Sequence, residues 1–390
     1  MATKSPMLDL YEELEAALHP YGDPERGLFV PMAFEHVELE YASIRKGCAL
    51  VDLPQSGTVE VAGADRLEFL NNLVTQELKG LEPMRSVRSF WLNRKGRIDA
   101  DLRLIDTGER TLMAADALVA AATAEALAEY VFAEDVTLEN ASERTHALAL
   151  HGPRATEALM AVADTEEDIS LEPGQAMMVS IAGEQVLVER EDSAGELGLH
   201  LTTRTEATKP IYVALASLET VRPCGWMAYN IARIEAGWPL FQIDFDGRSL
   251  PAETGVLDDR VSFTKGCYLG QEVVARMHAL GKPKQILIAL RLADGQEQRL
   301  PEEGAEIFAD ASAEKSIGNV TSSTIAPMLS ATPIALAQVR VTHTDPGTTL
   351  FVQAEGERTP FEVQPQLASW PTADASSGAS SSAESTPDRQ

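Results

Sequence analysis

The segment Ser262–Arg276, which reads SFTKGCYLGQEVVAR, concentrates residues that could do covalent chemistry. Gly266 and Gly270 allow the backbone to bend tightly or to approach a ligand closely. The pattern predicts a glycine-bearing turn followed by a helix, so that Cys267 lies just before a helix N-terminus with Lys265 nearby. Both features favour the thiolate over the thiol. The segment therefore contains a candidate reactive cysteine.

The same segment also fits a purely structural role. A free cysteine is most often a small buried hydrophobe, and a cysteine in a tight turn needs no chemistry. Glu272 and Arg276 are four residues apart on the predicted helix, so they share a face and could form a surface ion pair. The residue types leave the reactive and the structural interpretation open.

A second candidate lies on a predicted β-hairpin, formed by Ser86–Leu92 and Ile98–Ile105 around Asn93–Gly96. Along its second strand, apolar residues occupy the even positions from 98 to 104, whereas Asp99 and Asp101 point to the other face. A carboxylate placed in this way could contact a ligand. It could also be an ordinary solvent-facing residue, because one face of an antiparallel sheet is commonly wet.

The composition narrows the classes of function. The chain has 390 residues, and 60 acidic against 32 basic residues give a formal net charge of -28. We therefore expect no nucleic-acid partner and no anionic membrane partner. The three cysteines, Cys48, Cys224 and Cys267, are odd in number and far apart, and the sequence has no CxxC pair. This argues against a disulfide framework or a self-contained zinc site and predicts a reducing compartment.

Several common motifs are absent from the sequence. It has no P-loop, no GxGxxG after a predicted strand, no HExxH and no GxSxG, and its seven histidines show no metal-ligand spacing. Residues 1–20 lack the apolar core of a signal peptide, and no stretch reaches the length of a membrane span. We therefore predict a cytoplasmic protein without a metal site.

The remaining patterns predict alternating helices and strands ahead of an all-β C-terminal part. Helices are expected at 8–18, after Asp65, at 114–132, from 154, at 206–218 and at 226–236, and Asp65 with Glu68 fits a capping box. Further strands are expected at 58–61, 147–150, 177–181, 185–188 and 197–202. The stretch 238–262, rich in Pro, Gly and Asp, predicts a functional or disordered loop.

Short strand candidates follow a boundary at Gly281–Pro283. They lie at 286–292, 306–309, 318–323, 334–341 and 349–352, a spacing typical of a small β-barrel or sandwich. Residues 371–390 consist mainly of Ser, Ala and Pro and have little to bury. We therefore predict α+β domains at 1–140 and 141–282, a small β-barrel domain at 283–368, and a disordered tail at 369–390.

The run KGCYLGQE followed by VVAR resembles the signature of the YgfZ branch of the YgfZ/GcvT family. That signature is K-G-C-[FY]-x-G-Q-E followed by an Ala-Arg pair, and every position matches between Lys265 and Arg276. The resemblance covers about residues 25–355. Other segments resemble the family but are shared with the aminomethyltransferase of glycine cleavage: Val51–Leu53, Phe69–Asn72, Lys95–Arg97, Arg233–Gly237 and Leu250–Glu253.

The resemblance implies a three-domain GcvT-like cloverleaf around a central channel that binds tetrahydrofolate or a derivative, with folate bound by the domain at 1–140. The pterin edge carries N–H donors that suit a carboxylate, so Asp101 is expected to contact it. Asp99 is the alternative if the register is shifted by two residues. Tyr229, Trp226 and Trp91 are expected to wall the pterin ring, unless they are core residues.

Other residues are expected to complete the site by the same resemblance. Arg233 and Arg276 suit the anionic tail of folate, although each could belong to a structural ion pair. Lys265, Gln271 and Glu272 are the further cofactor-binding candidates. The catalytic candidates are Cys267 and Asp101.

One departure from the aminomethyltransferases separates the two branches. Those enzymes carry a glutamate in a G-[FY]-E-[IL] strand, whereas residues 196–201 here read ELGLHL, and we align the glutamate position with Gly198. They also lack the cysteine signature. Both differences favour the YgfZ branch.

The YgfZ branch implies a monomeric folate-binding accessory protein that supports iron–sulfur cluster assembly or repair in client proteins. In that function the Cys267 thiolate would be a transient ligand, a redox partner or a nucleophile. The alternative is a folate-dependent aminomethyltransferase or a related methyltransferase, which would make the chain a one-carbon transferase. A non-catalytic module with a vestigial pocket is the third interpretation.

Overall fold

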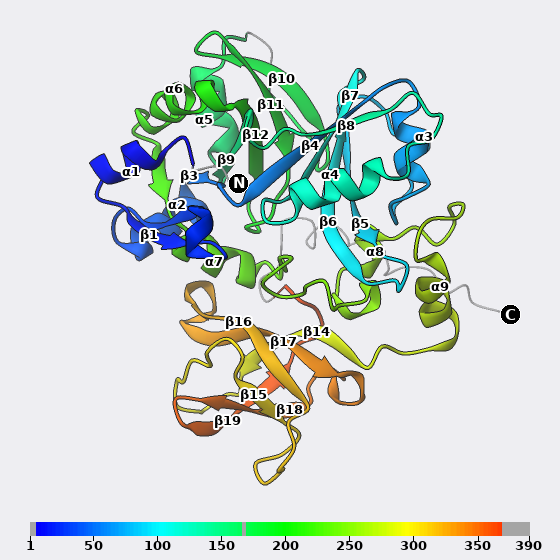
Figure 1. Ribbon diagram of the computed structural model, residues 1–390. Helices are drawn as coiled ribbons and strands as arrows, with labels where there is room; N and C mark the ends of the chain where they lie inside the picture. The colour runs from blue at the N-terminus through cyan, green and yellow to red at the C-terminus, as the bar shows by residue number, and fades with distance from the viewer. Residues whose placement is uncertain (1–4, 166–168, 369–390) are drawn as a thin grey trace, which may run out of the picture.

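Two open β-sheets and a closed β-barrel make up the chain (Figure 1). This computed structural model describes residues 5–165 and 169–368, so the predicted tail at 369–390 lies outside the described residues. A short hairpin near the N-terminus joins β1 (Ala17–Pro20) to β2 (Phe29–Ala33). No helix within the described residues has the length and apolar character needed to cross a membrane.

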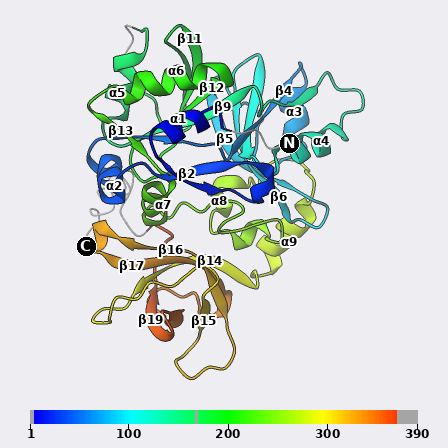
Figure 2. The same ribbon diagram turned by 60° about the vertical axis from the view of Figure 1, so that its left-hand side comes forward.

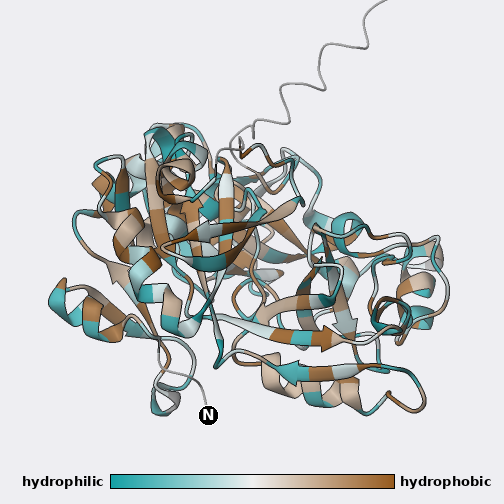
Figure 3. Ribbon diagram, turned by 90° about the horizontal axis from the view of Figure 1, so that it is seen from above, coloured by the Kyte–Doolittle hydropathy of each residue, from teal (hydrophilic) through white to brown (hydrophobic). Residues whose placement is uncertain are grey.

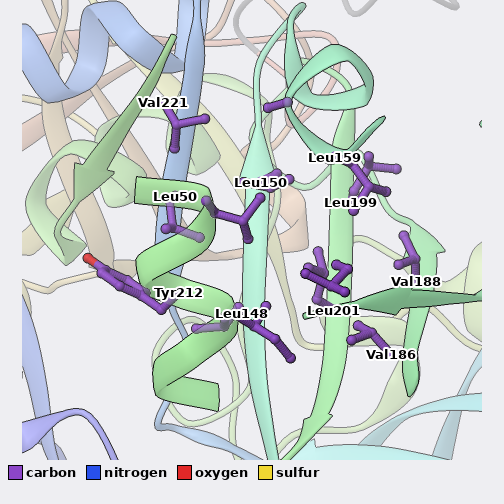
Figure 4. Packing of buried hydrophobic residues seen from close by; sticks show 14 of the residues in the cluster. Leu50, Leu148, Leu150, Leu159, Val186, Val188, Leu199, Leu201, Tyr212 and Val221 are labelled. Atoms are coloured by element: carbon purple, nitrogen blue, oxygen red, sulfur yellow. The ribbon is translucent and has the colours of Figure 1, made fainter. Parts of the chain in front are cut away.

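The first sheet has six strands, and helices cover both of its faces. Its strand order is β10 (Ala176–Ile181), β11 (Glu184–Arg190), β12 (Gly198–Arg204), β9 (Thr145–His151), β3 (Cys48–Asp52) and β13 (Val221–Cys224). One face packs against α1 (Leu8–Glu13), α5 (Ala155–Val162) and α6 (Thr205–Ala216), as Figure 4 shows for Leu148, Leu201 and Tyr212. The other face packs against α2 (Val37–Lys46) and α7 (Trp226–Glu235).

Strand β3 shows that the first unit is not continuous in sequence. All five of its residues are buried, as an apolar run requires when both faces of a sheet are covered. It pairs antiparallel with β9 and parallel with β13. Strand β3 therefore belongs to the six-stranded sheet, and helices α1 and α2 pack against its two faces, which differs from the predicted domain of residues 1–140.

The second sheet has five strands and stands beside the first, above the barrel in the view of Figure 1. Its strand order is β5 (Arg85–Leu92), β6 (Ile98–Asp106), β7 (Arg110–Asp116), β4 (Ser56–Ala62) and β8 (Thr137–Asn140). Its apolar face packs against α3 (Arg66–Asn71) and α4 (Ala120–Ala128). The predicted alternation along β6 is confirmed, because Ala100 and Leu102 lie in this core while Asp101 lies on the opposite face.

Two local expectations on this sheet were wrong. The helix expected at 114–132 begins only at Ala120, because residues 110–116 pair with β4 as a strand; sheet pairing here overrides the helix propensity of alanine. The Asp65 carboxylate does not cap α3, because it accepts a hydrogen bond from the backbone N–H of Asp135 at 2.8 Å. In both places a distant strand or loop determines the local structure.

The cysteine signature packs against the five-stranded sheet rather than the six-stranded one. Val261, Tyr268 and Val274 form one apolar cluster with residues of β5 and β6. Figures 1 and 2 both show α8 (Leu257–Arg260) and α9 (Gln271–Leu280) beside this sheet. The domain predicted for 141–282 is therefore split in space near residue 240.

The barrel confirms the all-β expectation and adds one strand to it. Its closed order is β14 (Gln285–Leu292), β17 (Thr332–Arg340), β16 (Gly318–Ala326), β15 (Glu306–Phe308), β18 (Thr349–Ala354) and β19 (Glu357–Val363). The unexpected β19 pairs with both β14 and β18 and so closes the barrel. The remaining short elements are single 3-10 turns, at Pro24–Arg26, Pro251–Glu253, Pro327–Leu329 and Val341–His343. Figure 3, which shows the molecule from above coloured by hydropathy, has hydrophobic residues on strands and helices alike.

A buried ion pair joins α7 to the barrel. Arg233 and Asp244 lie 2.7 Å apart, and both side chains are almost completely buried. Arg233 also donates to the Ser322 hydroxyl of β16 at 2.8 Å, and Asp244 accepts from Thr321 and Ser322. The next barrel strand contributes Gln338, whose side chain donates to the backbone of residue 253 at 3.2 Å. This joint fixes the barrel against the six-stranded unit.

We expect Arg233→Met to destabilise the protein by about 3–5 kcal/mol, because it leaves the Asp244 carboxylate buried without its cation. Urea unfolding followed by tryptophan fluorescence measures the change. Arg248→Met is the matched control, because Arg248 pairs with Asp246 at 2.6 Å but its side chain is 90% exposed, and its loss should change little. Equal effects of the two substitutions would contradict a specific role for the joint.

Candidate functional site

Two cavities lie between the facing sheets. The smaller has a volume of about 140 Å³, and the larger about 950 Å³. Arg88, Arg103, Glu191 and Trp238 line both of them. Arg88 stacks over the Trp238 ring with 4.8 Å between the guanidinium carbon and the ring centroid. This stacked pair therefore stands where the two cavities adjoin.

Asp101 lies in the smaller cavity between two arginines. Its Oδ1 is 2.9 Å from Arg260 Nε, and its Oδ2 is 3.6 Å from an Arg88 nitrogen. The Asp101 side chain is only 8% exposed, and such a carboxylate is stable in a buried site only when cations and donors compensate it. Strand β6 supplies the carboxylate, and the turn of α8 supplies Arg260 from 159 residues away in sequence.

The charges continue in alternation toward the other sheet. Arg88 donates to Glu191 at 2.7 Å, Glu191 accepts from Arg103 at 2.6 Å, and Arg103 Nε lies 3.0 Å from Glu189. Burial opposes the ionisation of Glu191, but Arg103 and Arg88 outweigh it and hold the pKa of this carboxyl well below its usual range. A ladder of opposite charges, defined here as Asp101, Arg88, Glu191, Arg103 and Glu189, thus crosses from β6 to β11.

Aromatic side chains wall the smaller cavity. Tyr21, Trp226, Tyr229, Trp238 and Phe241 all line it. The rings of Trp226 and Tyr229 are 5.9 Å apart, and the Tyr229 hydroxyl lies 3.0 Å from that of Ser193. Flat apolar walls with a carboxylate between them suit a planar ring that carries N–H donors. Trp91, by contrast, belongs to the apolar core of the five-stranded sheet.

Within segment 196–201, His200 and not Gly198 lines the smaller cavity, whereas Glu196 and Leu197 line the larger one. A Cβ added at Gly198 would lie 2.1 Å from the Glu191 carbonyl oxygen, so no side chain fits there. The His200 Nδ1 lies 3.0 Å from Arg103, and burial together with Arg103 lowers the pKa of this imidazole well below its ordinary value. His200 is therefore neutral at physiological pH, and β12 brings no carboxylate into the cavity.

Asp99 and Arg233 are engaged in contacts outside the two cavities, although the Arg233 guanidinium carbon lies 5.9 Å from the centroid of the Trp226 ring. Asp99 is exposed and accepts a hydrogen bond from the Asn93 side chain at 2.8 Å. Every guanidinium nitrogen of Arg233 is hydrogen-bonded: Nε to Asn230, Nη1 to Asp244 and the Trp238 carbonyl, and Nη2 to Ser322 of the barrel. Neither side chain lines the smaller or the larger cavity.

Lys265 holds a loop in place rather than facing the thiol. Its ammonium donates to the backbone carbonyls of Asn71, Val74 and Gln76 at 2.6, 2.8 and 2.8 Å. Burial lowers its pKa to about 8, which still leaves the ammonium charged at pH 7. The lysine therefore neutralises the partial negative charge of carbonyls at the end of α3.

Cys267 is exposed, whereas Cys48 and Cys224 are buried and have raised thiol pKa values. Burial is the main cause of both increases. The turn before α9 depends on Gly270, whose φ of 81° and close approach to the Asn93 carbonyl favour glycine. Cys267 lines neither of the two cavities, so its thiol faces solvent rather than the cavity that contains Asp101.

The other signature residues lie around this turn. The Gln271 side chain donates to the Gly266 carbonyl at 3.4 Å. Glu272 and Arg276 are exposed, and neither lines the two cavities. Across the described part of the chain, no three His, Cys, Asp or Glu side chains are grouped so that they could hold a metal ion.

A continuous strap connects the two candidate regions. We use this name for residues 259–268, which contain Arg260, Lys265 and Cys267. Thr75 donates to the Arg260 carbonyl at 2.6 Å and accepts from the Ser262 backbone N–H at 3.0 Å. The strap therefore begins at the cavity, where Arg260 contacts Asp101, and ends at the exposed cysteine.

Sequence reasoning missed most of the residues around the smaller cavity, among them Arg88, Arg260, Tyr21 and Asp116. Arg88 had a weaker signal, because it is a charged residue within the strand correctly expected at 86–92. Arg260 and Tyr21 come from loops without a periodic pattern, and Asp116 lay inside the helix wrongly expected at 114–132. Only long-range pairing brings these three to the site.

Two mixed α/β units that face each other across a ligand-sized cavity, with a closed six-stranded barrel beside them, define the class of glycine cleavage T-proteins. The GCVT N-terminal domain model matches residues 7–265, and the glycine cleavage T-protein C-terminal barrel domain model matches residues 286–367. The chain belongs to the GCVT family.

Proteins similar to this chain include aminomethyltransferases over nearly their whole length. The aminomethyltransferase of Bacillus pumilus is 27% identical over 363 residues, which cover 92% of this chain and 96% of that protein. The probable aminomethyltransferase of Natronomonas pharaonis is 28% identical over 357 residues, which cover 90% and 95%. The solved aminomethyltransferase T of the Bartonella henselae glycine cleavage system matches with a TM-score of 0.85 at 22% identity, over 95% of this chain and 99% of that one.

We expect Lys265→Met to destabilise the protein by about 2–4 kcal/mol, because three carbonyls lose their buried donor. Thermal and urea unfolding measure the loss. Lys95→Met is the control, since Lys95 is exposed on the neighbouring β5–β6 turn and should matter little. A Lys265→Met protein as stable as wild type would show that water replaces the ammonium without cost.

Proposed function

We propose that this protein binds a reduced folate of the tetrahydrofolate type in the two adjoining cavities and transfers a one-carbon unit to or from it. Aminomethyltransferases of the GCVT family use tetrahydrofolate. The observation that carries the proposal is the smaller cavity, in which aromatic walls surround a carboxylate fixed by two arginines. A transferase of the aminomethyltransferase type is the reading that its relatives support.

The chemistry of the cavity fits the two parts of such a ligand. A pterin ring is flat and carries N–H donors along one edge, and Asp101 would accept hydrogen bonds from these donors. Trp226 and Tyr229 would contact the faces of the ring. The larger cavity has space for the rest of the molecule, and Arg190 and Arg260 are among its basic lining residues. The proposed roles of Arg233 and Arg276 in holding the tail have no support from their positions.

A second function is favoured by one specific observation, the exposed Cys267 in a complete KGCYLGQE run. It is the folate-linked support of iron–sulfur proteins that the YgfZ branch implies. A solvent-facing thiol on a fixed turn suits a transient contact with a client protein. Lys265, Gln271 and Glu272 would then shape the turn rather than bind folate, and Cys267 would act outside the cavity.

We expect Asp101→Asn to weaken the binding of 5-formyltetrahydrofolate roughly 10- to 100-fold, because a charged acceptor in a buried site is lost. Isothermal titration calorimetry measures the dissociation constants. Asp99→Asn removes the same charge two residues away on the exposed face of the strand and should leave the affinity unchanged. No binding by the wild-type protein would end the folate proposal, and equal effects of the two substitutions would remove Asp101 from the site.

The Cys267→Ser variant separates the two candidate functions. Because the thiol lies outside both cavities, we expect folate affinity to stay within twofold of wild type under either function. Ammonia release and methylene-tetrahydrofolate formation from aminomethyl-lipoate should also persist if the protein is a transferase. If instead it supports iron–sulfur proteins, the variant should fail to restore iron–sulfur enzyme activities in a strain that lacks the gene, with Cys224→Ser as the buried control.

A further inference from the structure

The smaller cavity contains a second carboxylate, Asp116, in surroundings unlike those of Asp101. Strand β7 ends at Asp116, whose Oδ2 accepts a hydrogen bond from the Tyr21 hydroxyl and whose Oδ1 accepts from the Leu118 backbone N–H at 2.8 Å. Both Asp116 and Tyr21 line the cavity. Within residues 5–165 and 169–368, no lysine, arginine or histidine lies within ion-pair distance of this carboxylate. Asp116 is therefore a partly buried acid of the cavity that forms no ion pair with any of these residues.

The other charged groups that line this cavity already neutralise one another. They are Arg88, Asp101, Arg103 and Glu191, with the neutral imidazole of His200 beside Arg103. The loop after β1 contributes only the Tyr21 hydroxyl, whose own pKa burial raises strongly, so that it stays a proton donor. The charge of Arg233 reaches Tyr21 from α7, but Arg233 is paired with Asp244.

This environment raises the pKa of the Asp116 carboxyl above the ordinary value for an aspartic acid. Burial raises the pKa of the Asp116 carboxyl to about 6, although the hydrogen bonds from Tyr21 and Leu118 act in the opposite direction. Both protonation states are thus accessible close to neutral pH. When two acids in one site have environments that separate their titrations, one is suited to hold charge and the other to exchange protons.

We propose that Asp116, positioned by Tyr21, is the proton-exchanging acid of this cavity, and that Asp101 is its fixed anion. The inference rests on the proposed binding of a reduced folate and deepens it. The step is a proton transfer from a ring nitrogen of the bound ligand that has become cationic. The N–H bond breaks, its electron pair stays on nitrogen, and the proton forms an O–H bond with the Asp116 carboxylate. The acid returns the proton to the leaving product or to solvent.

The N-terminal hairpin makes this arrangement rigid. The Tyr21 backbone N–H donates to the Leu28 carbonyl at 2.8 Å, and Gly22, with a φ of 72°, packs so closely on Leu118 that an added Cβ would lie 3.0 Å from its side chain. Leu118 is also the residue whose backbone N–H binds Asp116. Tyr21 and Leu118 therefore fix both oxygens of the acid while one edge of it stays open to the cavity.

The test measures the protons taken up or released when 5-formyltetrahydrofolate binds. Calorimetric titrations at several pH values between 5 and 8, each in two buffers of different ionisation enthalpy, give that number directly. For the wild type we expect it to change with a midpoint near pH 6. In Asp116→Asn this transition should disappear while binding persists. In Tyr21→Phe it should move to higher pH, since the lost hydrogen bond favoured the ionised form.

Comparison of the Asp101→Asn and Asp116→Asn variants distinguishes failure of this inference from failure of the proposed function. Asp101→Asn should bind more weakly but keep the transition near pH 6. If folate binds and Asp116→Asn keeps the wild-type transition, the assignment of Asp116 is wrong while the folate proposal stands. If the wild type binds no folate, both fail.

Protein stability gives a second readout that a merely structural carboxylate would not show. The pKa of Asp116 is higher in the folded protein than its ordinary value of 3.8, so ionisation costs the folded state stability. This cost is absent below pH 3.8, grows up to about pH 6, and is complete above it. Asp116→Asn should therefore raise the melting temperature at pH 8 relative to wild type and lose that advantage at pH 4. A lower melting temperature at both pH values would indicate a structural role and contradict the proposal.

Discussion

The ladder of alternating charges between the two sheets is the constraint on which the candidate site depends. Each of its carboxylates and guanidinium groups is largely buried, and a buried charge without a partner costs several kcal/mol in proteins. Arg88 can pair with both Asp101 and Glu191 only if β5 and the end of β11, which Glu191 follows directly, lie in one fixed position relative to each other. These charged side chains cannot pack against one another as a dry apolar interface. They fix the two sheets relative to each other and also keep a cavity between them.

Burial and strand positions can be predicted from the sequence where the pattern of residues within one strand decides which side chains are buried. The alternation in β6 correctly separated the core residue Leu102 from the cavity residue Asp101, and the spacing of short apolar runs correctly indicated the barrel. Prediction failed where a partner distant in sequence decides the outcome. The sequence of residues 114–116 favours a helix, but these residues pair with β4 as a strand. Arg233 was expected to bind the ligand, but it pairs with Asp244, which is 11 residues away in sequence.

Lys265 shows that a residue in a motif typical of a reactive site can have a structural role. Proximity in sequence suggested that Lys265 would activate the Cys267 thiol. In the fold, three carbonyl oxygens surround the ammonium, and the geometry of this contact directs the lysine inward while the cysteine faces solvent. Because carbonyls near the end of α3 need a donor, the lysine stabilises this loop whether or not the thiol does chemistry.

The strap formed by residues 259–268 makes the two candidate functions physically related rather than exclusive. Arg260 contributes to the compensation of the Asp101 charge, and Thr75 binds the backbone on both sides of residue 261. Any ligand that displaced Arg260 from Asp101 would act on a segment whose other end carries Cys267. A displacement of this kind favours a ligand that supplies donors of its own to Asp101, because the buried carboxylate would otherwise keep only the more distant Arg88, at 3.6 Å, of its two arginines. A reduced pterin has such donors along its edge, so a pterin bound at Asp101 would act on the same strap that carries the thiol, through the Arg260 guanidinium.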